Sequence, residues 1–563
     1  MDKTIWHLFP PREEAKSIST ELGIPLEIAQ VLVNRDVTEP EAAQEFLFGT
    51  LDSLHDPFLM KDMREAVERI KQGIYKREKI LIFGDYDVDG ILSVVILHRA
   101  LESLGAEVDY FIPERLTEGY GIKEEYIKIV LERKAGLVIS VDCGIKALPF
   151  AKRAREEGID VIITDHHIPG DLLPETLAIL NPVLQNSGYP DKNLAGVGVV
   201  FKLIQALFAK EEKSLSLPWY LKLVSIATVA DVGQLRGENR LLVKFGLKAL
   251  EDVSDPGLSS LMEICRLKGR SVSAGDIGFR IGPRINAAGR MGKTDLAVKL
   301  FFTNSLPESL ELVNHLDELN SRRRRKQEKI YKQALERIRK SSFDDRYRFL
   351  ILGCEEWHRG VLGIVASKLK DFFHRPVLLF SYENGKAYGS GRTISEFPLI
   401  DCLHECKDWL LDYGGHSMAV GCVLERENMT FFRKAVNDFA QSRITDDHLR
   451  RKISIDSKID FADITSSFIE KYSLLSPFGA GNPTPVFLTE RAEVLGEPKE
   501  IKGRHTKLVV NQKGRIFEAL GWNRNDWAQN FKRGDIIDLV YSIQFSEYMG
   551  EKKLSLSLED IKN

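Results

Sequence analysis

The sequence predicts a multidomain α/β protein that ends in a small β-barrel, and three observations carry this prediction. The chain has 563 residues, enough for three or four domains of about 150 residues each. From residue 79, short β-branched runs alternate with amphipathic stretches, as in a parallel sheet covered by helices. After residue 452, short apolar runs alternate with turns, which is typical of a barrel.

Composition and charge exclude several classes of protein. Hydrophobic residues make up 43% and charged residues 29%, which is ordinary for a folded protein. The formal charge of −3 excludes a general polyanion binder, so any contact with nucleic acid must come from local patches. The six cysteines form no CxxC pair, which argues against a disulfide framework or a zinc ribbon. We expect a cytoplasmic protein without membrane contact, because the sequence shows no signal peptide and no bilayer-length apolar run.

The first half of the chain predicts a helical extension and one α/β lobe. Residues 1–50 have apolar positions at helical spacing. Five later runs predict strands: KILIFGDYD, AEVDYFIP, LVISVDCG, IDVIITDHH and LAILNP. Residues 197–265 are mainly helical in pattern. Their run IATVADVG ends in an acid, as the predicted strands do.

The second half predicts a linker helix, another α/β lobe and the barrel. Residues 305–341 have helical periodicity, and residues 321–340 carry ten Lys or Arg against two Glu. We interpret them as a linker helix whose basic face either follows phosphates or is simply solvated. YRFLILGC, a helical GVLGIVASKLKDFF and RPVLLFSY predict the second lobe.

Acids and histidines directly follow four runs that have a β-type pattern. They are Asp85, Asp87 and Asp89 in GDYDVDG, Asp142 in SVDCG, Asp165, His166 and His167 in TDHH, and Asp231 in ATVADVG. The carboxyl ends of parallel strands meet at one edge of a sheet, so these side chains are expected to lie together. Facing carboxylates repel unless a cation neutralises them, which indicates divalent metal. Oxygen and imidazole ligands suit manganese or magnesium, although each motif alone could be a turn or a helix cap.

The four motifs, in this order, resemble those of the DHH phosphoesterase superfamily. The resemblance implies a site for two divalent metal ions, manganese or magnesium, and hydrolysis of phosphodiester bonds without a covalent intermediate. It implies metal ligands at Asp85, Asp87, Asp89, Asp142, His166 and Asp231. It also implies catalytic roles for Asp142, His166 and His167, with His167 orienting the phosphate. The chain departs from many members at Phe83, where they have a histidine.

Further motifs resemble the bacterial exonucleases of this superfamily that are specific for single-stranded DNA. They are FIPERLTEGYG, GPRINAAGRMG, WHRGVLGIVASKL, GSGRTISEFPLIDCL, GGHSMAVGC and SPFGAGNPTPVF. The resemblance implies 5′ to 3′ release of mononucleotides from single-stranded DNA in repair and recombination. It divides the chain into an extension (1–50), a DHH catalytic domain (51–304), a linker helix (305–345), a DHH-associated substrate-binding domain (346–450) and an OB-fold domain (451–563).

Polar residues within these motifs are candidates for substrate binding. They are Arg115, Tyr120, Arg284, Asn286, Arg290, Ser390, Arg392 and His416. We expect Arg115, Ser390 and Arg392 to bind a 5′-phosphate, because a hydroxyl beside a guanidinium suits that group. We expect the residues of GPRINAAGR to lie beside the metal site. In GGHSMAVG, Gly414 and Gly415 predict a turn that presents His416 to the scissile phosphate, although a helix start with a buried histidine fits too.

Aromatic residues are candidates for stacking on bases. Trp357 and His358 fit base stacking and core packing equally well. The tail mixes aromatic and basic residues, as single-strand binders do, and half of these aromatics are expected in the barrel core. They are Phe517, Trp522, Trp527, Tyr541, Phe545 and Tyr548, among Lys502, Arg504, Lys507, Lys513 and Arg515. We expect the tail to be separate from the metal site, so that deletion of residues 453–563 weakens binding of long strands more than cleavage of short ones.

Other functions remain open at this point. A phosphodiesterase for cyclic dinucleotides or short oligonucleotides shares the chemistry but does not require the tail. A non-enzymatic replisome scaffold would be expected to have lost its acidic residues, and pyrophosphate hydrolysis would need a much shorter chain. The resemblance makes a helicase and a single-strand-binding protein candidate partners beside single-stranded DNA, and we expect a monomer.

Overall fold

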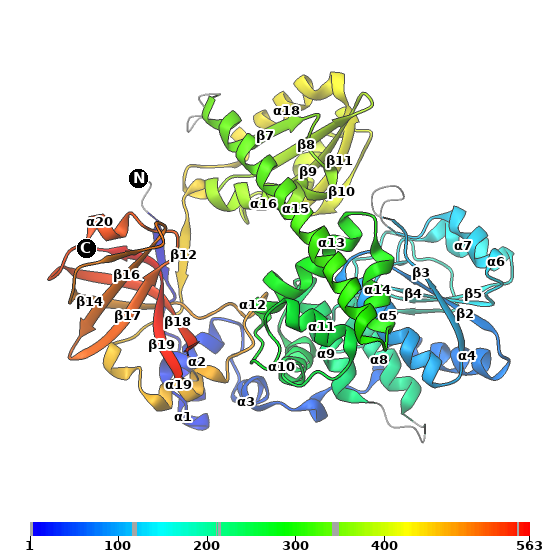
Figure 1. Cartoon of the computed structure of the whole chain (residues 1–563), viewed down its shortest axis with the longest axis horizontal. Helices are drawn as coiled ribbons and strands as arrows, with labels where there is room; N and C mark the ends of the chain where they lie inside the picture. Colours follow the sequence, from blue (N-terminus) through cyan, green and yellow to red (C-terminus); the bar gives the residue numbers. More distant parts are fainter. Residues whose placement is uncertain (1–3, 115–120, 210, 212–215, 341–347, 549–550) are drawn as a thin grey trace. The chain divides into compact units, whose positions relative to one another are not determined.

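The computed structural model describes residues 4–114, 121–209, 211, 216–340, 348–548 and 551–563 (Figure 1). These residues form two compact units. The larger unit comprises the described residues within 6–113, 121–282 and 452–563, and the smaller one comprises residues 4, 5 and 114 and the described residues within 283–451. None of the described helices combines the length and the apolar character that a membrane crossing needs.

The larger unit contains the predicted parallel sheet. Its strands are β2 (Lys79–Gly84), β3 (Glu107–Phe111), β4 (Leu137–Val141), β5 (Asp160–Thr164) and β6 (Ala178–Leu180). Their order in the sheet is β3-β2-β4-β5-β6, and every neighbouring pair is parallel. The continuous apolar runs form strands here because helices cover both faces of the sheet.

Helices pack on the two faces of this sheet. On one face, Leu81 and Phe83 of β2 share a core with α6 (Ile127–Glu132) and α7 (Leu148–Glu156). Alternate residues of a strand point to the opposite face. There α5 (Val88–Ser103) and α8 (Gly196–Phe208) contact the strands, and α4 (Met63–Tyr75) contacts β6 and α8.

A helical layer completes this lobe and corrects one prediction. It consists of α9 (Leu217–Ala230), α10 (Gly237–Ala249), α11 (Pro256–Ile264) and the short α12 (Ala274–Asp276). The run IATVADVG is therefore the end of helix α9, and Asp231 follows a helix, not a strand as the sequence predicted. Because α9 is buried on nearly all sides, it lacks the amphipathic period that would have identified it as a helix.

The described part of the smaller unit contains three helices, followed by the second sheet with three further helices. The helices are α13 (Gly282–Arg290), α14 (Thr294–Phe302) and the long α15 (Leu306–Lys340). The sheet has the order β10-β11-β9-β8-β7, and only β7 and β8 are parallel. Its strands are β7 (Leu350–Cys354), β8 (Val377–Glu383), β9 (Lys386–Arg392), β10 (Asp412–His416) and β11 (Ala419–Glu425), with helices α16 (Leu362–Phe373), α17 (Leu399–Glu405) and α18 (Met429–Arg443).

The tail forms the predicted barrel. Strand β14 (Phe487–Val494) pairs with both β18 (Ile536–Tyr548) and β16 (His505–Gln512). The ring β14-β18-β19-β17-β16 is thereby closed, through β17 (Arg515–Gly521) and β19 (Glu551–Lys562). The smaller elements of the tail are β12 (Lys452–Ile455), β13 (Ser457–Lys458), β15 (Lys499–Ile501), α19 (Ser466–Ser473) and α20 (Trp527–Asn530).

The barrel packs against the N-terminal extension and is hydrogen-bonded to the rest of the larger unit, whereas its expected separation from the metal site stays a prediction. Its core includes residues of α1 (Glu13–Leu22), α2 (Leu26–Val33) and α3 (Pro40–Phe48), which lie against it in Figure 1. The extension also begins with a strand, β1 (Ile5–Leu8), which pairs with β12. Leu235 and Arg236 donate hydrogen bonds to the carbonyls of Ala480 and Gly481, which links the helical layer of the first lobe to the loop that precedes β14.

Candidate metal centre

The carboxyl edge of the parallel sheet gathers the predicted acids and histidines. Asp85, Asp87 and Asp89 follow β2, Asp142 follows β4, and His166 and His167 follow β5. Asp231 reaches the same group from the end of α9. The structure therefore brings together every residue that the sequence analysis proposed as a metal ligand.

Two helix starts hold the first acids. Asp87 caps α5, since its Oδ1 accepts hydrogen bonds from the N–H groups of Asp89 and Gly90, at 2.9 and 3.1 Å. Asp89 is buried in the first turn of α5. Its two carboxylate oxygens accept hydrogen bonds from the N–H groups of Gly196 and Val197 at the start of α8, each at 2.8 Å. A carboxylate at a helix N-terminus is favoured because unpaired N–H groups point at it.

The backbone conformation of Asp142 is fixed by a hydrogen bond to the neighbouring strand. Its N–H donates to the carbonyl of Thr164 at 2.9 Å, and its φ of 58° lies in the left-handed region that aspartate tolerates better than most residues. The backbone of Gly196 passes close to its carboxylate. A Cβ at position 196 would lie 2.5 Å from Asp142 Oδ1, so only glycine fits there.

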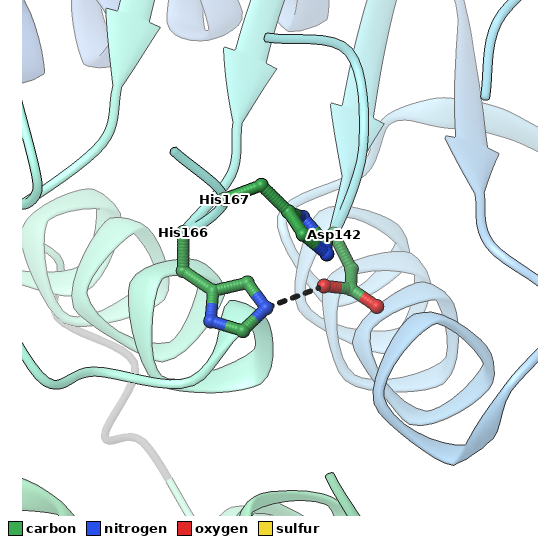
Figure 2. A group of neighbouring side chains, drawn as sticks. All are labelled: Asp142, His166 and His167. Atoms are coloured by element: carbon green, nitrogen blue, oxygen red, sulfur yellow. Dashed lines mark ion pairs between the residues drawn. The ribbon is translucent and has the colours of Figure 1, made fainter. Parts of the chain in front are cut away.

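The two histidines have different neighbours. His166 Nε2 lies 3.1 Å from Asp142 Oδ1, as Figure 2 shows, and 3.8 and 4.0 Å from carboxylate oxygens of Asp231 and Asp89. His167 Nδ1 lies 2.7 Å from Asp165 Oδ1, which also accepts hydrogen bonds from the N–H groups of both histidines. Asp165 thus orients His167, a role that the sequence analysis missed.

The ligand atoms form three overlapping groups that could each hold a metal ion. The groups are Asp85 with Asp87 and Asp142, Asp89 with His166 and Asp231, and Asp142 with His166 and His167, and the ligand atoms within each lie within 4.8 Å of one another. Asp142 Oδ1 is buried, and among the described residues it accepts no hydrogen bond. Buried oxygen atoms beside imidazole nitrogen fit manganese or magnesium.

The pKa values of these side chains in the absence of metal also indicate that the cluster binds a cation. Burial raises the pKa of Asp142 and Asp231 well above the ordinary value, and the surrounding carboxylates raise it further. Burial, followed by the charge of Asp87, raises the pKa of Asp89 to about 7. For His167, burial lowers the pKa, but the contact with Asp165 outweighs it and the net pKa is raised. These carboxylates need a positive charge to stay ionised at neutral pH.

Three family descriptions match successive parts of the chain. "DHH family, N-terminal domain" matches residues 79–228, "DHHA1 domain" matches 346–442, and "RecJ OB domain" matches 455–560. The single-stranded-DNA-specific exonuclease RecJ of Bacillus subtilis is 37% identical over 558 residues, which are 98% of this chain and 70% of that protein. RecJ of Escherichia coli is 32% identical over 574 residues, or 98% of both chains.

The chain belongs to the RecJ family. Solved structures of RecJ from Thermus thermophilus have the same fold. The complex with Mn²⁺ superimposes with a TM-score of 0.84 at 29% identity and covers 100% of this chain and 80% of that one. The complex with Mg²⁺ has a TM-score of 0.78 at 28% identity and covers 100% and 78%.

Phe83, the one departure from the superfamily pattern, lies in the core of this RecJ homologue. Its ring is fully buried and packs against Phe111 and Tyr126, with centroids 5.2 and 5.4 Å apart. The carboxylate of Asp85 instead joins Asp87 and Asp142. Asp85 is therefore placed where it can supply a ligand in place of a histidine at position 83.

Ser390 and Arg392, predicted to bind a 5′-phosphate, lie on β9 of the smaller unit and point to the same place. A Cβ at Gly363 would lie 2.9 Å from both Ser390 Oγ and Arg392 Nη2. Because Gly363 lies in the first turn of α16, a hydroxyl and a guanidinium converge on a helix N-terminus. This combination suits an anionic group.

Other predicted substrate residues lie elsewhere in the smaller unit or outside the described residues. Arg115 and Tyr120 lie outside them. On α13, Arg284 Nε donates to Asp317 Oδ1 at 2.8 Å, Asn286 is half-buried, and Arg290 Nη1 donates to the carbonyl of Gly360 at 3.1 Å. That these three residues lie beside the metal site stays a prediction.

In the smaller unit, the structure corrects one sequence-based interpretation and decides between two alternatives that the sequence left open. Gly414 and Gly415 do not form a turn but belong to the edge strand β10, and the exposed His416 ends that strand. The two small residues hid the strand because they carry no β-type side chains. Trp357 is fully buried in the core with Leu362 and donates to Gln333 Oε1 at 2.9 Å, so core packing describes it. His358 caps a short helix by accepting from the N–H of Gly360.

The aromatic residues of the barrel divide between core and surface, as expected. Tyr541 and Trp527 are buried, and Phe517 packs against the same core. Trp522 is 48% exposed and Phe545 is 42% exposed. The side chain of Tyr548 lies outside the described part of the chain. Exposed aromatic rings of this kind remain available for base stacking.

Proposed function

We propose that this protein is a metal-dependent exonuclease that degrades single-stranded DNA from its 5′ end to mononucleotides. The observation that carries the proposal is the cluster of acids and histidines at the carboxyl edge of the sheet, in a chain that belongs to the RecJ family. RecJ relatives are named as single-stranded-DNA-specific exonucleases, and one was solved with Mn²⁺. Such an activity would serve DNA repair and recombination in the cytoplasm.

The proposed metal ligands are the residues of the cluster. Asp142 belongs to two of the three groups and would be shared between two ions. A divalent metal pair supplies a water of lowered pKa and neutralises charge on the phosphate oxygens. His166 lies between Asp142, Asp89 and Asp231 and would complete the ligand set. His167, held by Asp165, would donate a hydrogen bond to the phosphate or its leaving oxygen.

The direction of degradation would come from recognition of the 5′-phosphate. Ser390 and Arg392 on β9 supply a hydroxyl and a guanidinium beside the first turn of α16. We propose Arg115 and Tyr120 as further contacts, and His416 as a contact to the scissile phosphate. Trp522 and Phe545 would stack on bases of the strand, with the basic residues of the barrel along its phosphates.

The remaining partners are proposals as well. A helicase would supply the single strand, and a single-strand-binding protein would keep it open. We propose that the enzyme acts as a monomer. The barrel argues against a small-substrate phosphodiesterase, because a cyclic dinucleotide does not require it.

Hydrolysis of an end-labelled strand tests the proposal. A long single strand labelled at its 5′ or 3′ end is incubated with manganese, magnesium or chelator, beside duplex DNA, RNA and a cyclic dinucleotide. We expect early release of the 5′ label as a mononucleotide, only with metal and only from single-stranded DNA. Turnover of the cyclic dinucleotide with the long strand untouched would assign a small-substrate phosphodiesterase, and no turnover in any condition would favour a scaffold.

The variant Asp142→Ala tests the site itself. We expect hydrolysis to fall by more than about 100-fold, because loss of even an outer-shell partner of a metal can cost that much. Binding of single-stranded DNA, measured by fluorescence anisotropy, should change little. Asp171→Ala is the matched control, since Asp171 is exposed on the loop that follows the histidines. Retained hydrolysis in Asp142→Ala would remove Asp142 from the metal site.

A further inference from the structure

Asn239 joins two segments of backbone that are distant in sequence. It lies in the first turn of α10 and is fully buried. Its Oδ1 accepts a hydrogen bond from the N–H of Ala195 at 3.3 Å. Its Nδ2 donates to the carbonyls of Asn193 and Gln234, at 2.5 and 3.1 Å. One amide side chain therefore fixes the segment before α8 and the segment before α10.

The first of these segments, residues 193–195, directly precedes the start of α8, which contacts Asp89 and Asp142. Ala195 is the residue before α8, whose first two N–H groups bind the carboxylate of Asp89. At the same point, Gly196 lies against the carboxylate of Asp142. A shift of residues 193–195 would therefore move the N–H groups that hold Asp89.

The second segment leads to Asp231. Gln234 follows Asp231 by three residues, across a tight turn in which Val232 is left-handed with φ 62°. The N–H of Gly233 donates to the carbonyl of Thr228 at 2.9 Å, and Asn239 holds the end of the turn through Gln234. The direction of the Asp231 side chain depends on this turn, because its backbone leaves α9 there.

Asn239 is itself anchored by a buried polar network. The N–H of the adjacent Glu238 donates to Asp191 Oδ2 at 2.7 Å. The carboxylate of Glu238 pairs with Lys202 Nζ at 2.9 Å, and both side chains are almost completely buried. These contacts hold the first turn of α10 in place. A residue can align other groups only if its own backbone is held in this way.

We propose that Asn239 is a positioning residue that sets the separation of Asp89 and Asp231, and so prepares the metal centre to bind its ions. These two carboxylates approach His166 Nε2 from different elements, at 4.0 and 3.8 Å. Without a cation they repel each other, so their spacing depends on the start of α8, which holds Asp89, and on the turn after α9, which carries Asp231. The proposal rests on the proposed metal centre and adds a residue that contacts neither metal nor substrate.

Metal affinity, not activity alone, tests the proposal. Free Mn²⁺ is measured by electron paramagnetic resonance during titration of the wild type, Asn239→Ala and Asn239→Ser. We expect the dissociation constant to rise about 10- to 100-fold in Asn239→Ala, as for other outer-shell partners of metal ligands. Asn239→Ser, which has a hydroxyl in place of the amide, should have a dissociation constant between those of the wild type and Asn239→Ala. Hydrolysis by both variants should recover at high Mn²⁺, since no catalytic group is lost.

A matched control separates positioning from loss of stability. Gln512 in the barrel is also a buried amide that accepts one backbone hydrogen bond, from Phe461, and donates two, to Glu490 and Asp460. Gln512→Ala should lower the unfolding temperature about as much as Asn239→Ala but leave Mn²⁺ affinity unchanged.

The outcomes are distinct. The proposal would be overturned if Asn239→Ala bound Mn²⁺ as tightly as the wild type does. If the alanine variant does not fold, the same result in Asn239→Ser would overturn it. So would an equal loss of affinity in Gln512→Ala. A wild type that binds Mn²⁺ without hydrolysing DNA would refute the proposed function alone, whereas a wild type that binds no Mn²⁺ would refute both.

Discussion

At the scale of single residues, the metal centre depends on the missing side chain of Gly196. We predict that Gly196→Ala weakens Mn²⁺ binding and lowers hydrolysis at limiting Mn²⁺ by about 10- to 100-fold. The added Cβ would lie 2.5 Å from Asp142 Oδ1, so the carboxylate or the start of α8 must move. Titration of activity with Mn²⁺ measures the effect.

Gly170→Ala is the control for this substitution. Gly170 lies on the exposed loop after the histidines, and only the carbonyl of Leu172 would come near its Cβ, at 3.9 Å. The Gly170→Ala variant should bind Mn²⁺ and hydrolyse DNA as the wild type does. Unchanged Mn²⁺ dependence in Gly196→Ala would mean that the Asp142 carboxylate is not a ligand in the observed position.

The raised pKa of Asp89 predicts a pH dependence of metal binding. In the metal-free protein this pKa is about 7 instead of 3.8, so the folded state holds a proton that the unfolded state has lost between these values. The stability of the metal-free protein should therefore fall as pH rises from about 4 to 7. Mn²⁺ must displace this proton, so its affinity should rise as the pH approaches this pKa and level off above it.

Thermal unfolding with EDTA or Mn²⁺ at several pH values measures both effects. The gain in unfolding temperature on adding Mn²⁺ should grow from pH 5.5 to pH 7.5, values chosen to bracket the pKa of about 7. A gain that is the same at every pH would show that Asp89 binds metal without losing a proton.

The cluster of acids and histidines could be predicted from the sequence, but the residues that support the cluster could not. Asp142 and His166 each end an apolar run, and that pattern is local. Asn239 acts on Asn193 and Gln234 through main-chain atoms, which leave no trace in residue type. Asp165 was visible within its motif, but its contact with His167 required the turn geometry.

At the scale of elements, continuous apolar runs correctly predicted the parallel strands that helices cover on both faces. The same kind of run wrongly predicted a strand where the structure has a buried helix. The runs of β2, β4 and β5 are continuous and apolar, as buried parallel strands require. Helix α9 is also apolar on nearly all sides, so the same signal led to the wrong element before Asp231.

The start of α16 is the proposed contact site for the 5′-phosphate. We predict that Arg392→Ala lowers the preference for a 5′-phosphorylated strand over a 5′-hydroxyl strand by about 10- to 100-fold, since a hydrogen bond to a charged group contributes about 1.5 to 3 kcal/mol. The guanidinium lies beside Gly363 in the first turn of α16. Competition between the two labelled strands measures the preference.

Arg426→Ala is the control within the same lobe. Arg426 pairs with Glu355 and lies over the ring of Tyr382, away from the α16 start in sequence and in its contacts. It should keep the preference for the phosphate. If both variants keep it, recognition of the 5′ end does not use Arg392.

At the scale of the whole molecule, the sequence predicted the kinds of lobe but not which surfaces share a core. Alternation and turns identified the barrel, and helical spacing identified α2. Neither pattern says that Ile28 of α2 packs in one core with Phe487 and Leu539 of the barrel. Contacts between segments more than 400 residues apart in this chain arise from tertiary packing, which local periodicity does not encode.

The shared core changes how the tail should be tested. Deletion of residues 453–563 would expose α1 to α3, so a loss of DNA binding could not be assigned to the barrel surface. We predict that Ile28→Ala costs about 2 to 5 kcal/mol and reduces hydrogen-exchange protection in β14 and β18. Leu369→Ala, an equally buried change on α16 of the smaller unit, should leave those strands protected. If Ile28→Ala leaves barrel protection intact, the extension and the barrel fold independently and the deletion becomes informative again.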